Sequence, residues 1–303
     1  MSQPISLSDA VTKDELRELV KTSDLKALGI LAGTYAIIAS AFAMAILWPN
    51  PLTIVVAIAL LAGRQLGLAV IMHDCAHHAF FSNRKVNEFV GHWLAGGPMN
   101  VSVHAYRAYH LKHHQHAGTP KDPDIALVKN YPVSRASLRR KFTRDFTGRT
   151  GIRDLIFKLR KLKLPKDLPW LVFHATLFAA LWFAGAPWVY MLWWVAELFV
   201  YPAVTRLRNI GEHGVVKDRL SLEPRDNTNT TIANPIERLF LAPNYVNFHC
   251  EHHHFAAVPP YNLPRLHRLM RERGYYDHHD SVTRGYRDVI RRAMRPDTVP
   301  AAA

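Results

Sequence analysis

Cysteine is scarce in this sequence: Cys75 and Cys250 are the only two among 303 residues, and they lie far apart. This scarcity argues against a disulfide framework and against zinc sites built from paired thiolates. We expect both cysteines to be small apolar side chains of the interior, in a reducing compartment. The first 21 residues are polar and carry no secretory signal peptide, and no haem, flavin or iron–sulfur motif marks a second domain.

Acidic residues are also in short supply. The chain has 24 Asp and Glu against 38 Lys and Arg, which gives a formal net charge of +14. Such an excess is compatible with nucleic-acid binding, with an anionic membrane surface, or with loops held on the cytoplasmic side of a membrane. The basic residues lie between long apolar runs, especially over 107–166. The membrane interpretations therefore account for the charge, and we do not expect nucleic-acid binding.

The sequence is rich in apolar runs, of which there are four. The first has no charge over 22 residues, which is enough to cross a bilayer, and short uncharged turns join the runs in pairs. The runs are Ala27–Trp48, Leu52–Met72, Leu168–Phe183 and Trp188–Val204. We predict an all-α integral membrane protein with four transmembrane helices in two hairpins, over about 27–48, 52–72, 168–184 and 188–206. Buried core helices are the alternative, which is strongest for the short third run.

The positions of Lys and Arg predict the topology. Positively charged loops stay on the cytoplasmic side of a membrane. This rule places the N-terminal segment 1–26, the long middle loop and the C-terminal third in the cytoplasm, so that both termini are cytoplasmic. We expect a single domain over 27–295, in which a cytoplasmic helical cap covers the span ends, and a disordered tail over 296–303.

Two other segments are compatible with a membrane surface. Ile152–Leu164 places apolar residues on one helical face and Lys or Arg on the rest, which predicts an interfacial helix or, alternatively, an ordinary solvated one. Val86–Val103 is polar and Gly-rich, and we expect it to be interfacial or re-entrant. Within the spans, Arg64 and Glu197 are costly charges. We predict that they pair; the alternative is that one of them lines a ligand cavity and binds a polar group.

Histidine is abundant, with 18 residues, and most of the notable ones fall in four clusters. The clusters read HDCAHH, HLKHH, RNIGEHG and HCEHHH. On a helix, residues at i, i+3 and i+4 share a face, so the members of each cluster can converge. The first and third clusters follow predicted spans that both run toward the cytoplasm, so the clusters can meet just outside the bilayer. The candidate metal ligands are His73, His77, His78, His110, His113, His114, Asn209, His213, His249, His252 and His253.

So many imidazoles exceed what one zinc or iron ion takes, and two ions are implied. We expect the flanking carboxylates of Asp74, Glu212 and Glu251 to orient the imidazoles. The alternative, unrelated surface histidines, remains open for the extra residues His78, His116 and His254. Six histidines lie apart from these clusters and are expected to be structural: His92, His104, His174, His267, His278 and His279.

These motifs resemble the membrane fatty acid desaturase and hydroxylase superfamily. HDCAHH, HLKHH and HCEHH are similar to its three histidine boxes, RNIGEHG to its additional Asn-x-x-x-His group, and EHHHFAAVPPYNLPRLH to the sequence that follows its third box. The resemblance extends from Ala27 to about Met270. It implies four spans, a non-haem centre of two iron ions, and oxygen-dependent attack on a C–H bond of a lipid chain. It also implies that the catalytic residues are His73, His77, His110, His113, His114, His213, His249, His252 and His253, with Asn209 acting directly or through water.

The resemblance leaves the outcome of the reaction open. Desaturation of an acyl chain is the preferred interpretation, and hydroxylation or ketolation of an acyl, sphingoid or carotenoid lipid by the same centre is the alternative. From other classes, a metal-binding transporter and a zinc hydrolase remain. Electrons are expected from a separate ferredoxin or small haem protein. The basic residues that could dock an acidic donor, or contact anionic lipid instead, are Arg135, Arg139, Arg140, Lys141 and Arg144.

Overall fold

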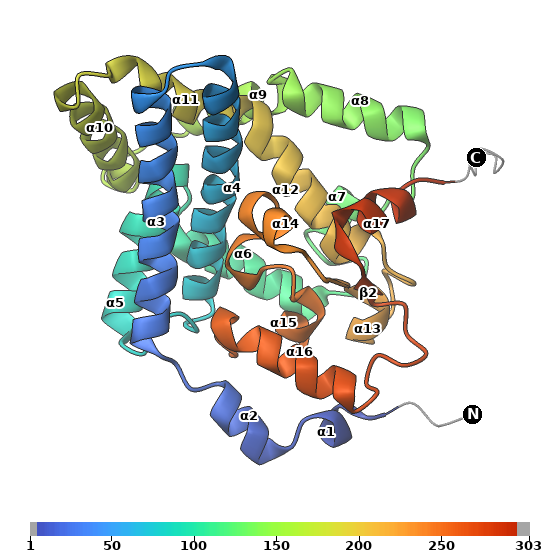
Figure 1. The fold of residues 1–303 in the computed structure, drawn as a ribbon. Helices are drawn as coiled ribbons and strands as arrows, with labels where there is room; N and C mark the ends of the chain where they lie inside the picture. The colour runs from blue at the N-terminus through green and yellow to red at the C-terminus, as the bar shows by residue number, and fades with distance from the viewer. Residues whose placement is uncertain (1–4, 296–303) are drawn as a thin grey trace.

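A computed structural model describes residues 5–295, and most of this chain is helical. Two long antiparallel helices, α3 (Asp24–Leu47) and α4 (Pro51–Ala76), run side by side (Figure 1). The turn between them follows from the sequence: Asn50 caps the N-terminus of α4 with its side chain, and Pro51 occupies the first helical position, where its missing N–H costs nothing. The first predicted hairpin is therefore present.

A second apolar pair follows later in the chain. The helix α10 (Leu168–Phe183) ends at a turn in which Gly185 has a φ of +75°. A continuous helical stretch over Pro187–Gly214 comes next. It consists of η3 (Pro187–Val189), α11 (Tyr190–Val195), η4 (Ala196–Val200), α12 (Tyr201–Asn209) and η5 (Ile210–Gly214), of which η4 and η5 are wider π turns. Pro202 lacks the N–H that a regular α turn would use, which fits the π turn just before it.

Three of these helices are long and apolar enough to cross a membrane: Asp24–Leu47, Pro51–Ala76 and Pro187–Gly214. The third predicted run forms a helix of 16 residues, which spans about 24 Å and is shorter than a typical hydrocarbon core. Two helices extend beyond the predicted spans, because α4 continues past Met72 to Ala76 and the last stretch continues to Gly214. The added turns carry histidines.

The segment between the two hairpins is a chain of short helices. They are α5 (Arg84–Phe89), η1 (Val90–Gly96), η2 (Gly97–Met99), α6 (Val103–His116), α7 (Ile125–Val128), α8 (Arg135–Phe146) and α9 (Arg149–Arg160). The prediction of an amphipathic helix near Ile152–Leu164 agrees with α9, which leaves apolar side chains such as Ile156 and Phe157 exposed. The region predicted as interfacial or re-entrant forms α5, η1 and η2.

The C-terminal third packs against α4 and η5. Its elements are α13 (Pro224–Asn227), β1 (Thr230–Thr231), α14 (Pro235–Phe240), η6 (Pro243–Tyr245), α15 (His249–His254), η7 (Pro260–Asn262), α16 (Leu263–Glu272), β2 (Val282–Thr283) and α17 (Gly285–Arg292). The strands β1 and β2 pair in parallel. The helix α15 contacts α16 and lies near α6 and the end of α4 (Figure 1). The predicted disordered tail, 296–303, lies outside the described residues.

The predicted ion pair between Arg64 and Glu197 is wrong. Arg64 donates from Nη2 to the carbonyl oxygens of Leu239, at 2.5 Å, and Arg238, at 3.4 Å, which end α14. Glu197 accepts from Lys158 Nζ at 3.0 Å. Arg64 therefore joins α14 to α4, and Glu197 joins α9 to η4. Helical periodicity alone does not reveal these partners. Both cysteines are free and buried, as predicted.

The N-terminal helices α1 (Leu7–Ala10) and α2 (Lys13–Leu19) pack on the C-terminal third. Glu15 forms a bidentate ion pair with Arg273, with distances of 2.6 and 2.7 Å. Hydrogen bonds from the Arg273 side chain and from the Thr12 backbone lower the pKa of Glu15 to about 2. The unfolded-state pKa is about 4.3, so the stabilisation is complete above that pH and is lost as the pH falls toward 2.

This linkage predicts how a Glu15→Gln variant behaves. Its unfolding free energy should lie below that of the wild type by about 1 kcal/mol or less at pH 7, because the pair is partly exposed. The difference should shrink as the pH falls from about 4.5. Denaturant titrations of both proteins at several pH values measure it. A difference that stays constant down to pH 3 would contradict the assigned pair.

Candidate metal centre

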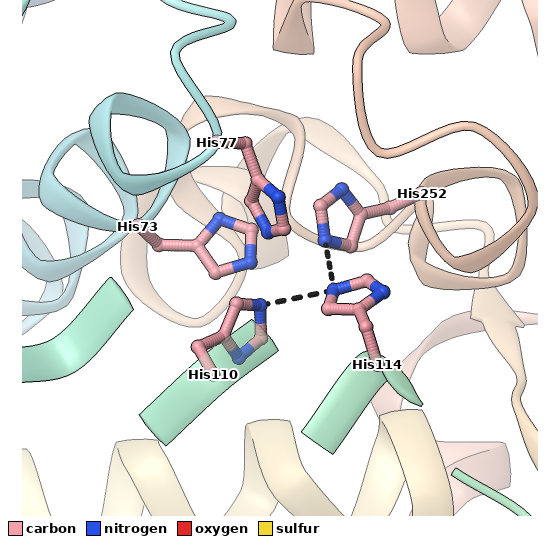
Figure 2. Close-up of side chains that lie close together, drawn as sticks. All are labelled: His73, His77, His110, His114 and His252. Atoms are coloured by element: carbon pink, nitrogen blue, oxygen red, sulfur yellow. Dashed lines mark hydrogen bonds between the residues drawn. The ribbon is translucent and has the colours of Figure 1, made fainter. Parts of the chain in front are cut away.

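Nine histidines from four separate segments converge in two adjacent groups. The end of α4, the helix α6, the π turn η5 and the helix α15 supply them. The first group is His73, His77, His110, His114 and His252, and the second is His113, His213, His249 and His253. Within each group the candidate ligand nitrogens all lie within 4.8 Å of one another. Figure 2 shows the five rings of the first group facing a common centre.

The spacing of the nitrogens matches shared coordination. His114 Nε2 lies 3.1 Å from both His110 Nε2 and His252 Nε2, and in the second group His249 Nε2 lies 2.8 Å from His213 Nε2. Two nitrogens bound to one ion at about 2.1 Å, at right-angled or tetrahedral positions, are roughly 3.0–3.4 Å apart. The rings of His114 and His253, one from each group, stack with centroids 4.4 Å apart, so the groups are neighbours.

The helices α6 and α15 each contribute to both groups. His110 and His114, one turn apart, enter the first group, whereas His113 enters the second. On α15, His252 enters the first group, and His249 and His253 enter the second. The expectation that each HxxHH motif converges on a single point is therefore wrong. A residue at i+3 lies on the other side of the shared helical face from one at i+4, and this difference separates the groups.

The π turn η5 decides which side chain of the third cluster reaches the histidines. An α-helix would place Asn209 and His213 on one face, but the wider turn of η5 shifts their relative direction. His213 joins the second group, and Asn209 lines a cavity beside it. Extra turns of this kind occur frequently at functional sites.

Outer partners fix the orientation of several rings. His73 Nδ1 lies 2.9 Å from Asp74 Oδ1, His113 Nδ1 lies 2.7 Å from Asp122 Oδ1, and His213 Nδ1 lies 3.1 Å from the carbonyl oxygen of Asn227. A carbonyl oxygen accepts only, so His213 Nδ1 carries the proton and its Nε2 presents a lone pair. Sequence reasoning missed Asp122 and Asn227, although Asp122 stands nine residues after His113, within an Asp-Pro-Asp motif that was available as a signal.

The other two predicted carboxylates behave differently. Glu212 pairs with Arg208 at 2.5 Å, and its Oε1 lies 3.8 Å from His249 Nδ1. Glu251 accepts at 2.5 Å from His267 and from Thr230, and it also accepts from Tyr276. Among the described residues Glu251 thus has no hydrogen bond to the nine histidines, and its prediction as an orienting group for them is wrong. It anchors the short helix α15 to β1 and to α16.

Burial favours the neutral form of several of these imidazoles. Burial, and after it the neighbouring imidazoles, lowers the pKa of His114 to about 2. The same two causes lower the pKa of His249, His252 and His253 well below the usual range. A neutral imidazole with its Nδ1 proton engaged offers an Nε2 lone pair, which is the form that binds metals.

The donor set fits a metal ion in each group. The Nε2 atoms of His73 and His77 are buried without a hydrogen-bond partner among residues 5–295. An unpartnered buried polar atom is costly, and a metal ion would satisfy it. The sets contain only imidazole nitrogens, with carboxylates outside, which suits iron and zinc more than calcium or magnesium.

The extra histidines lie outside both groups. His78 has a φ of +57°, and its ring lies between Glu88, with Nδ1 at 3.1 Å, and Arg84. The Nε2 of His254 lies 3.2 Å from the Tyr275 hydroxyl, and His116 is also outside. The remaining isolated histidines stay outside the groups as well; they are His92, His104, His174, His267, His278 and His279.

Comparison with known proteins identifies the family of the chain. The family model for fatty acid desaturase matches residues 28–286. The chain is 28% identical to the sn-1 oleoyl-lipid 12-desaturase of Synechocystis sp., over 68% of this chain and 65% of that protein, so it spans slightly less than two thirds of that relative. It is 25% identical to the dihydrorhizobitoxine desaturase of Bradyrhizobium elkanii, over 90% of this chain and 83% of that protein. It is 28% identical to a beta-carotene ketolase of Paracoccus sp., over 71% of this chain and 80% of that protein.

The family model covers most of the chain, and the histidine motifs gather at one place. The protein therefore belongs to the fatty acid desaturase family of oxidoreductases.

Proposed function

We propose that this protein desaturates the acyl chain of a membrane lipid, using oxygen and two iron ions held by the nine histidines. The observation that carries the proposal is the pair of adjacent imidazole groups at the ends of α4 and η5, which are the ends of two apolar helices. In the overall reaction, the chain loses two hydrogens and forms a double bond. One oxygen molecule, two electrons and two protons complete the balance, and two water molecules are released.

The side chains of the protein would position the two irons and shield them from bulk water. The first five histidines would hold one iron and the remaining four the other, with Asn209 beside the second group. The bound irons would supply the activation of oxygen and the removal of hydrogen from carbon, which side chains alone do not perform. Asp74 and Asp122 would keep His73 and His113 in the tautomer that presents Nε2. Burial of the rings would keep bulk water from the reacting centre.

The protein is proposed to span the membrane four times, with its termini and histidines in the cytoplasm. Three long apolar helices support this, and α10 would be the fourth span, accommodated by local thinning of the bilayer. The basic residues between the hairpins support the cytoplasmic orientation. The exposed apolar face of α9 would then lie at the membrane interface.

A separate protein is proposed to deliver the electrons. A ferredoxin fits, because such donors are acidic and α8 exposes several basic side chains. These are Arg135, Arg139, Arg140 and Arg144. Association through charges of this kind should weaken as the salt concentration rises.

Oxygen insertion is the second candidate, favoured by one observation. The chain is 28% identical to a beta-carotene ketolase and covers 80% of it, a coverage close to the 83% of the dihydrorhizobitoxine desaturase. A ketolase or hydroxylase would use the same nine histidines, so the site does not separate the two outcomes.

The deciding experiment joins metal analysis to product analysis. The purified protein should retain about two iron ions per chain, and it should consume oxygen only when reduced ferredoxin is supplied. Mass spectrometry of lipids from an expressing host should show products two mass units lighter. Products heavier by one oxygen would favour the hydroxylase or ketolase, zinc with oxygen-independent activity would favour a hydrolase, and metal movement across vesicles would favour a transporter.

A further inference from the structure

A cavity of about 360 Å³ lies between α9, η4 and α12. Its volume falls in the range of small-molecule binding sites. Leu127 and Asn209 line it, and the same two residues line a smaller cavity whose other walls include His113, His213 and His249. The larger cavity is therefore the neighbour of the second histidine group and is not part of it.

Every cation that lines this cavity has a carboxylate partner. Arg153 pairs with Asp154 at 3.2 Å, and Lys158 pairs with Glu197 at 3.0 Å. Arg206 donates to the buried carboxylate of Asp145, with one distance of 2.9 Å. The lining is thus locally neutral. A ligand with a full charge would find no unpaired counter-charge in the cavity, so the unfavourable free energy of its desolvation would not be offset.

The pair of Lys158 and Glu197 nevertheless has spare hydrogen-bonding capacity. Lys158 Nζ has three N–H donors, of which two bond within residues 5–295, to Glu197 and to the carbonyl oxygen of Met99 at 2.8 Å. Glu197 accepts one bond on each oxygen, from Lys158 and from Trp193 Nε1 at 3.3 Å, and each oxygen has a further lone pair. The side chain of Glu197 is only 6% exposed, so this capacity is directed into the protein interior and not into bulk solvent.

We propose that this cavity binds a neutral oxygen-bearing group of the substrate, a hydroxyl or a carbonyl, through Lys158 and Glu197. This inference rests on the proposed function, because it assigns the class of substrate for the neighbouring histidines. A hydroxyl can accept from the free N–H of Lys158 and donate to Glu197, whereas a carbonyl takes the first bond alone. A free carboxylate would face Glu197 and be disfavoured.

The location of Glu197 supports a role in binding. Ionisable residues within an apolar span are costly and usually functional, and Glu197 lies in the π turn η4 of the stretch Pro187–Gly214. The pair also attaches α9 to η4, so a purely structural role is the alternative that an experiment has to separate.

Ligand-induced thermal stabilisation of the full-length protein in detergent tests the proposal without iron, oxygen or turnover. The probes are octadecan-1-ol, octadec-1-ene and stearate. We expect the wild type to bind the alcohol about tenfold more tightly than the alkene, the gain from one hydrogen bond to a charged group, and more tightly than stearate. Lys158→Met should weaken this preference, because only Glu197 remains to accept a hydrogen bond from the hydroxyl. Glu197→Gln, which keeps the shape but leaves Lys158 unpaired, should reverse the order and favour stearate.

Lys161→Met is the matched control for Lys158→Met. Lys161 is exposed, directly follows the last residue of α9, and does not line the cavity. It should behave as the wild type. The proposal is overturned if stearate stabilises the wild type most, if the three probes act equally, or if Glu197→Gln leaves the order unchanged. A purely structural pair would lower the melting temperature of the variants without changing the order of the probes. If the order is as expected and no lipid is oxidised, the proposed function fails and the binding site stands.

Discussion

Replacing His77 with asparagine will remove iron from the first histidine group and lower oxidation of the substrate by at least about a hundredfold, whereas the same replacement of His78 will leave both unchanged. The two residues are adjacent in sequence but point to different surroundings. The Nε2 of His77 is buried in the first group and has no hydrogen-bond partner in the described part of the chain, and the centroid of its ring lies 4.8 Å from those of His114 and His252. The ring of His78 instead contacts Glu88 and Arg84.

The two variants control each other. Asparagine tolerates the positive φ of His78, so His78→Asn should fold without backbone strain. Iron per chain, measured by elemental analysis of the purified variants, should fall from about two to about one in His77→Asn. Circular dichroism spectra should be the same for both. Loss of iron in His78→Asn, or full iron in His77→Asn, would mean that the ring positions do not define the ligands.

The sequence was sufficient to select the nine histidines, because motif spacing and the ends of apolar runs are local features. Periodicity does not determine how rings from different segments are shared between two groups. His113 and His114 are neighbours that enter different groups, and this depends on where α15 and η5 lie relative to α6. The π turn was not predictable either, because no single residue type specifies it, and Asn209 is therefore placed differently from an α-helical expectation.

Polar contacts between residues far apart in the sequence could not be predicted either. Arg64 was assigned to Glu197 because both lie at similar depths of parallel helices, yet its partners are carbonyl oxygens of α14, which is 174 residues away in sequence. Glu251 flanks three histidines in the sequence, but the helix turns its side chain toward His267. The apolar helices and their order follow from composition, whereas the partner of a buried charge depends on the packing of the whole chain.

The carboxylate that sequence reasoning missed leads to the second large expected effect. Asp122→Asn should weaken retention of the metal in the second group by about 10- to 100-fold, the usual effect of removing an outer partner of a ligating histidine. Asp122 is 8% exposed and accepts from His113 Nδ1 at 2.7 Å and from the backbone N–H of Asp124 at 2.8 Å. Asparagine keeps the shape but removes the charge, which makes His113 a weaker donor to metal and no longer fixes its tautomer.

Asp124→Asn is the matched control for this effect. Its carboxylate lies 3.7 Å from His113 Nδ1, beyond hydrogen-bond distance, and accepts from the Tyr109 hydroxyl at 2.5 Å. We expect its metal retention to change by less than about threefold. The rate at which a chelator strips iron from each protein distinguishes the cases, because a site of two ions should release one quickly and one slowly in Asp122→Asn. Equal loss of both ions, or a lower melting temperature that accounts for the release, would assign Asp122 to the stability of the loop after α6. Release of one ion only would show that Asp122 holds the metal of the second group specifically. The first group should keep its ion, because its outer carboxylate is Asp74, which contacts His73.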